Sequence, residues 1–224
     1  IEDVFLKTGY LTSGAVTIEE VKGMADVAIQ SPGVCQGMGT ANSMHVVCEA
    51  LGMALPGSAP VAAGSAKMHA DLRAAGARIV DMVWEDLKPR DIVTAAAVDN
   101  AITAVLALGG STNAIVHLVA IARRAGIPLT VDRFDDLARK TPLIANVRPA
   151  GKYLMEDFYY AGGLRALLAS IGDLLALGER TVNGRTLGEN IAGAEIFNPD
   201  VILPRDKPLV ANDSLAVLHG NLAP

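Results

Sequence analysis

The chain has 224 residues, 51% of them hydrophobic and 19% charged, so it can bury a core as one large domain or as one domain with part of another. Its formal net charge is −5, and its 19 basic residues form no continuous basic stripe, which argues against a nucleic-acid partner. No apolar run reaches the roughly 20 residues that cross a bilayer, and two cysteines are too few for a disulfide framework, so we expect a cytoplasmic protein that does not enter the membrane.

The first predicted helix covers residues 41–54 and begins after Thr40, which is a suitable N-cap. The apolar residues of one face recur at helical spacing and are Met44, Val47, Cys48, Leu51 and Leu55. We therefore expect this face, including Cys48, to lie in the core.

A second helix is predicted over residues 62–77, because Gly76 is a typical helix terminator. Residues 78–83 fit either a short strand or the start of the next helix. Two longer helices follow: one capped by Thr94 and running through Leu108, and one capped by Ser111 or Thr112 and running to about Ala125. Gly109 and Gly126 are expected to end them.

The rest of the chain contains shorter elements. We expect, in order, a helix near 132–139, a strand over 143–147, a loop over 151–163 that enters a helix, and an amphipathic helix over 164–177. Short β-like runs at 201–203 and 215–218 then lie among prolines. Long helices with few short strands predict a helix-rich α/β fold, with one domain over 1–197 and a linker plus the first strand of a β-rich domain over 198–224.

A glycine-rich loop over residues 33–44 holds the first candidate functional residue, Cys35. The glycines let the backbone approach a bound group closely, and a cysteine thiolate can bind a metal or attack an electrophile. The alternative is a small buried side chain without a chemical role. A nucleophilic Cys35 would also need a histidine within hydrogen-bond reach, and His45 lies too far along the predicted helix to be an obvious partner.

The segment Gly109-Gly-Ser-Thr-Asn113 joins two predicted helices. Backbone N–H groups at the start of the second helix, with the hydroxyls of Ser111 and Thr112, would form a binding site for a carboxylate or a phosphate. Helix capping alone is the alternative. His117, one turn further on, is interpreted as a core residue and is left out of the site.

Residues 152–163 contain two adjacent acids, Glu156 and Asp157. Adjacent residues point in different directions on a helix, so the pair is a poor candidate for an acid–base device. We expect them to cap the helix or to orient a neighbouring loop rather than to bind a metal. No metal-ligand spacing connects Cys35 with the histidines, so the sequence predicts no zinc site built by this chain alone.

Several of these segments together resemble one known family. They are Cys35-Gln-Gly-Met-Gly-Thr-Ala-Asn-Ser-Met44, Glu49-Ala-Leu-Gly-Met-Ala-Leu-Pro-Gly-Ser58, Asn100-Ala-Ile with Gly109-Gly-Ser-Thr-Asn-Ala114 and His117-Leu118, residues 151–163, and Leu218-His-Gly-Asn-Leu-Ala-Pro224. In this order they are similar to the dihydroxy-acid and sugar-acid dehydratase family, which groups dihydroxy-acid dehydratase with 6-phosphogluconate and aldonate dehydratases. The resemblance runs almost from end to end of the chain.

The resemblance implies a hydro-lyase that removes water from a 2,3-dihydroxy acid and gives a 2-keto-3-deoxy acid. In the family, three cysteines hold a [2Fe–2S] or [4Fe–4S] iron–sulfur cluster that acts as Lewis acid, and Mg²⁺ holds the substrate. Cys35 matches the third of these cysteines, and Cys48 matches none. The resemblance also implies that the Mg-binding Asp and Lys precede Ile1 and that the catalytic serine follows Pro224. We therefore expect a partial chain without catalytic residues of its own.

The substrate and the assembly follow less directly from the resemblance. Residues 154–163 are closer to sugar-acid dehydratases and residues 35–42 to the dihydroxy-acid branch, and we favour a sugar (aldonic) acid, with dihydroxy-acid dehydratase of branched-chain amino-acid synthesis as the alternative. Ser111, Thr112 and Asn113 are expected near the substrate. The family implies a homodimer or homotetramer. A hypothesis of another class is a non-catalytic scaffold or binding module.

Overall fold

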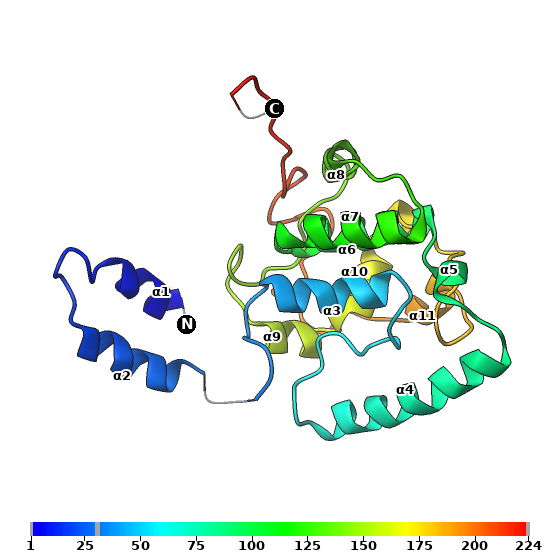
Figure 1. Cartoon of the computed structure of the whole chain (residues 1–224), viewed down its shortest axis with the longest axis horizontal. Coiled ribbons are helices and arrows are strands. Elements are labelled where there is room, and N and C mark those ends of the chain that lie inside the picture. Colours follow the sequence, from blue (N-terminus) through cyan, green and yellow to red (C-terminus); the bar gives the residue numbers. More distant parts are fainter. Residues whose placement is uncertain (1, 30–31, 223–224) are drawn as a thin grey trace. The chain divides into compact units, whose positions relative to one another are not determined.

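The computed structural model describes residues 2–29 and 32–222 (Figure 1). Its helices are α1 (Glu2–Gly9), α2 (Ile18–Ala28), α3 (Thr40–Ala50), α4 (Ala66–Trp84), α5 (Pro89–Ile92), α6 (Ala95–Leu108), α7 (Asn113–Ala125), α8 (Val131–Ala138), α9 (Met155–Tyr160), α10 (Gly163–Ser170), the 3-10 turn η1 (Gly172–Leu174) and α11 (Leu187–Ile191). The chain divides into two compact units, residues 1–35 and 36–224. The helix-rich character predicted from the sequence is confirmed.

The first unit consists of α1 and α2, which pack against each other. The start of α2 is fixed by Thr17 and Glu20. The Thr17 hydroxyl accepts the Glu20 N–H at 3.2 Å, and the Glu20 carboxylate accepts the Thr17 N–H at 2.7 Å. These reciprocal bonds satisfy two N–H groups at the helix start that would otherwise lack a partner.

Helix α6 forms the centre of the second unit. Its sequence is apolar nearly all round, and eleven of its 14 residues are buried, as expected for a helix without a polar face. Thr94 caps its start by accepting the Ala97 N–H, and Gly109 ends it in the left-handed conformation with φ of 70°. Helices α3, α7 and α8 pack around it. The predicted boundaries of α6 are confirmed.

Helices α4 and α10 differ from prediction. Gly76 does not end α4, which continues to Trp84, so residues 78–83 are neither a strand nor a new helix. The alanines on both sides of Gly76 favour helix strongly enough to offset the cost of about 1 kcal/mol for an interior glycine. Helix α10 is shorter than the predicted 164–177, because the chain tightens into η1 at Gly172.

The predicted strands are wrong as regular strands within the described residues. Residues 143–147 make isolated bridges to three different partners, Leu143 to Val210, Ala145 to Ile202 and Val147 to Tyr153. Because successive residues pair with separate segments, no ladder can extend. Residues 215–218 form no strand either, since this stretch contacts helices: the Ser214 hydroxyl donates to the Leu106 carbonyl and the Val217 N–H to the Asp135 carboxylate.

The domain boundary predicted at 197/198 stays a prediction. Val201 and Ile202, which follow that boundary, are buried in the core of the second unit. In the part of the chain that the structure describes, no helix is both long and apolar enough to span a bilayer.

Candidate functional site

The first turn of α3 and the segment that begins α7 meet through four side chains, those of Thr40, Ser43, Ser111 and Asn113. The Ser43 hydroxyl accepts the Ser111 N–H at 2.8 Å, and the Asn113 Nδ2 donates to the Thr40 hydroxyl at 2.7 Å. The hydroxyl oxygens of Thr40 and Ser111 lie 3.3 Å apart. Helix starts separated by about 70 residues in sequence are thereby joined by polar contacts.

Close approach of these segments depends on Gly110. A Cβ at this position would lie 2.8 Å from Val105 Cγ1 and 3.1 Å from Ser43 Oγ. The first distance is shorter than side chains tolerate, so a larger residue would clash with α6, and the second leaves little room beside Ser43.

A third segment, residues 146–155, holds the loop that leads into α3. The Met38 N–H donates to the Arg148 carbonyl at 2.7 Å, and the Met155 N–H donates to the Gln36 carbonyl at 2.8 Å. The start of α9 and the bend at 148 therefore clamp residues 36–38 from two sides. Asp157 caps α9 by accepting the Leu154 N–H at 2.8 Å, which confirms its predicted role as a capping residue.

The predicted anion site at the start of α7 differs from expectation. The Asn113 N–H donates to the Ser111 hydroxyl, and the Ala114 N–H donates to the Ser111 carbonyl. These donors are thus used within the segment, as the capping alternative predicts. The start of α3 is different, because its N-cap is Gly39 and no side chain caps it. A positive helix end without a capping side chain favours an anionic group.

The predicted site residues fall into two groups. Ser111 and Asn113 are joined to Thr40, and Thr112 beside them is exposed with no side-chain cap bond. Cys35 is partly buried and is the last residue of the first unit, immediately before the clamped loop. His117, expected in the core, is exposed.

The described residues do not by themselves fit an iron–sulfur cluster. A cluster needs several thiolates, and no group of three His, Cys, Asp or Glu side chains suited to a metal occurs among them. Cys35 is the one cysteine in the loop. The prediction that Cys48 lies in the core is wrong: α3 buries the face around Val46, Val47 and Ala50, and Cys48 is exposed on another side. Its apolar surroundings raise the pKa of the Cys48 thiol, which disfavours the metal-binding thiolate.

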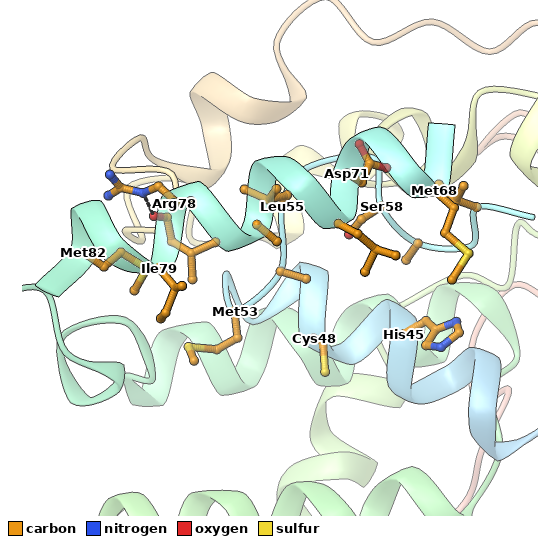
Figure 2. Close-up of a pocket in the computed structure, with 16 residues that line it drawn as sticks. His45, Cys48, Met53, Leu55, Ser58, Met68, Asp71, Arg78, Ile79 and Met82 are labelled. Carbon is orange, nitrogen blue, oxygen red and sulfur yellow. Dashed lines mark hydrogen bonds between the residues drawn. The ribbon is translucent and has the colours of Figure 1, made fainter. Parts of the chain in front are cut away.

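A groove separate from the polar junction lies between α3, the loop after it and α4. This groove has a volume of about 510 Å³ and is lined mainly by apolar side chains, with His45 and Cys48 on the α3 side (Figure 2). Its charged residues Asp71 and Arg78 already pair with Lys67 and Glu85. Both charged side chains of the groove are therefore already engaged in ion pairs.

Glu49, a buried carboxylate at the end of α3, is not among the residues that the sequence singled out for a role. Its two oxygens accept the N–H groups of Gly57 at 2.7 Å and Ala59 at 2.8 Å. Burial raises the pKa of Glu49 from 4.5 to about 7, opposed by the N–H donors of residues 57–59 and by the positive charge of Arg165. The sequence gives no signal for this contact except a glutamate preceding a Pro-Gly turn.

The raised pKa of Glu49 predicts a loss of stability as pH rises. Below pH 4.5 the carboxyl is protonated in both states; between 4.5 and about 7 the unfolded chain releases the proton while the folded chain retains it. This difference lowers the free energy of unfolding by about 3 kcal/mol across that range. Urea unfolding from pH 4 to 8 should show the decline in the parent relative to Glu49→Gln. A pH-independent difference between the two proteins would contradict the prediction.

The sequence matches a known family over most of its length. Residues 1–190 match the family described as Dihydroxy-acid/6-phosphogluconate dehydratase N-terminal. The chain belongs to this family. Its relatives include proteins named dihydroxy-acid dehydratase from Caldicellulosiruptor saccharolyticus, Roseiflexus sp. and Methanosarcina barkeri, at 42%, 44% and 42% identity over 100%, 100% and 99% of this chain.

Family membership confirms the resemblance predicted from the motifs. The matched range contains the loop before α3, the loop before α7 and residues 146–155, so the polar junction belongs to the dehydratase N-terminal domain. The chain spans 41% of the length of each of these three relatives.

Proposed function

We propose that this chain is part of a hydro-lyase that converts a 2,3-dihydroxy acid into a 2-keto-3-deoxy acid. The C2 proton and the C3 hydroxyl leave together as water, and the resulting enol becomes the ketone at C2. The main support is the convergence of three dehydratase segments at the starts of α3, α7 and α9. Ligand sites commonly lie between packed helices, where several elements of a fold meet.

The residues at this junction have distinct proposed roles. The uncapped start of α3 and the exposed Thr112 hydroxyl would bind the polar groups of the substrate. Ser111 and Asn113 would position that surface through their contacts with Thr40. These roles concern binding and orientation, and no proton-transfer step is assigned to them.

Cys35 has a separate proposed role as one thiolate ligand of the iron–sulfur cluster that the family implies. The clamp holds residues 36–38, which directly follow Cys35 in the chain. The other cluster ligands and the Mg²⁺ ligands are not among the groups that the described residues bring together, so we derive no step through either cofactor.

Two substrate classes fit the proposed reaction. Residues 154–163 support a sugar acid, whereas the printed names of the relatives support a dihydroxy acid of the kind that dihydroxy-acid dehydratases use. Dehydratase assays with a six-carbon aldonic acid and with a five-carbon branched 2,3-dihydroxy acid distinguish the two substrate classes. We favour the dihydroxy acid, since relatives above 40% identity carry that name. A cytoplasmic location and a homo-oligomeric assembly remain part of the proposal.

Substitution of each cysteine tests this proposal. In the native protein, purified without oxygen, Cys35→Ser should lower bound iron and reduce 2-keto acid formation by about 100-fold, the upper range for loss of a residue that supports a metal site. Cys48→Ser is the matched control, because Cys48 is exposed on another part of α3. Unchanged iron in Cys35→Ser would contradict the ligand assignment, and a parent protein without iron or dehydratase activity would favour a scaffold.

A further inference from the structure

Helix α4 is unusually exposed for its length. It has 19 residues, and Met82 is the only buried one. Figure 1 shows it apart from the packed group of α3, α6, α7 and α10. The Arg78 side chain, which donates to the Val182 carbonyl, anchors it near its C-terminal end. Because an amphipathic helix in a folded protein owes most of its stability to packing, so bare a helix indicates a partner.

Only one face of α4 lines the groove. Met68, Leu72, Ala75, Ile79 and Met82 line the groove. The opposite face is formed by residues spaced alternately four and three apart: Ala66, Ala70, Arg73, Ala77, Val80 and Trp84. Such spacing is typical of a helix that packs along a second helix. Val80 is 53% exposed and Trp84 is 85% exposed.

This outward face carries two charges of opposite sign. Arg73, Ala77 and Asp81 form one row at i, i+4 and i+8. The other α4 charges Lys67 and Arg78 form ion pairs, but neither Arg73 nor Asp81 does so with any residue in the described ranges. Asp81 only attracts Arg78 at longer range. The row therefore carries one positive and one negative side chain at its ends, and neither has an ion-pair partner among the described residues.

A two-fold axis at Ala77 would pair these charges. Helices whose contact residues recur four and three apart commonly pack lengthwise at about +20°. In an antiparallel crossing at Ala77, residue 73 of each helix lies opposite residue 81 of the other, and residue 84 lies opposite residue 70. The bulky Trp84 then meets the small Ala70. The face is thus complementary to itself in charge and in size, as a two-fold interface requires.

We propose that the outward face of α4 binds the same face of a second copy of this chain. Each Arg73 forms an ion pair with Asp81 of the second copy, and Trp84 supplies the main apolar contact, as tryptophan commonly does in interfaces. This inference does not depend on the proposed reaction.

Charge reversal tests the pairing. Sedimentation equilibrium of the native protein gives the dimer Kd, and Arg73→Asp or Asp81→Arg alone should raise it at least about tenfold because like charges then face each other. The double variant carrying both reversals should restore the parent Kd to within about threefold. Arg124→Asp, at an exposed position in the last turn of α7, is the control. A parent monomer, or single reversals that leave Kd unchanged, would overturn the proposal.

Cysteine substitution tests the antiparallel orientation. Under oxidising conditions, Ala77→Cys should form a disulfide-linked dimer, while Ala70→Cys and Trp84→Cys should not, because only residue 77 meets itself across the axis. The parent chain, with Cys35 and Cys48, sets the background. Cross-linking at all three positions would indicate a parallel arrangement, and cross-linking at none would show that another part of the protein or no partner covers α4; either result rejects this interface.

Discussion

Replacing Glu49 by alanine is expected to lower the free energy of unfolding by about 4 kcal/mol, because two buried donors lose their acceptor at once. The N–H groups of Gly57 and Ala59 both bond to this carboxylate. A buried donor without a partner costs about 1–3 kcal/mol, and the truncated side chain also leaves a small cavity. Urea unfolding at a fixed pH of 4, where Glu49 is protonated in both the folded and the unfolded state, measures the change.

A local measurement separates the loop from the rest of the fold. Hydrogen exchange at Gly57 and Ala59 should accelerate in Glu49→Ala more than exchange in α6, because the carboxylate holds that loop directly. Glu156→Ala is the matched control: Glu156 is an exposed glutamate on α9, and we expect a change below about 0.5 kcal/mol. A cost below 1 kcal/mol for Glu49→Ala would show that the carboxylate does not hold the loop.

Helix ends were the part of the fold most accessible from the sequence. Thr94 supplies its own cap bond, and Gly109 and Gly126 adopt positive φ, so each signal acts through the residue that carries it. The prediction that Gly76 ends a helix was wrong. An isolated glycine among helix formers does not end a helix when residues beyond it are anchored, as Arg78 and Met82 are.

The strands and the buried face of α3 were not predictable in the same way. A β-like composition at 143–147 shows that the segment suits an extended backbone, but ladder formation depends on what lies beside it. Helical spacing likewise placed Cys48 on an apolar face, whereas the core lies around Val46 and Val47. Neighbours distant in sequence decide both outcomes, and periodicity carries no information about them.

The sequence predicted individual segments of the candidate site but not the contacts that join them. Cys35 and Ser111 to Asn113 were selected from their loops, but the contact of Asn113 with Thr40 spans 73 positions and has no local signal. The clamp from residues 146–155 was missed for the same reason. Family resemblance indicated that these segments act together, and the hydrogen bonds explain how they meet.

Replacing Gly151 by alanine should destabilise the clamp, by about 3 kcal/mol in the free energy of unfolding. A Cβ there would lie 2.4 Å from the Asn146 carbonyl carbon and 2.6 Å from the Val147 nitrogen. Both are backbone atoms that cannot rotate away, so the clash must move the loop. That loop presents the Arg148 carbonyl to the Met38 N–H, so the disturbance should reach the segment that follows Cys35.

The control for this change is Gly178→Ala, because an added Cβ at Gly178 meets no atom within 4 Å. We expect its unfolding free energy to stay within about 0.5 kcal/mol of the parent value. Hydrogen exchange at Met38 should accelerate in Gly151→Ala and remain unchanged in the control, since only the first variant moves the acceptor of that N–H. If Gly151→Ala unfolds like the parent while Met38 keeps its protection, the bend at 148 does not support the loop before α3.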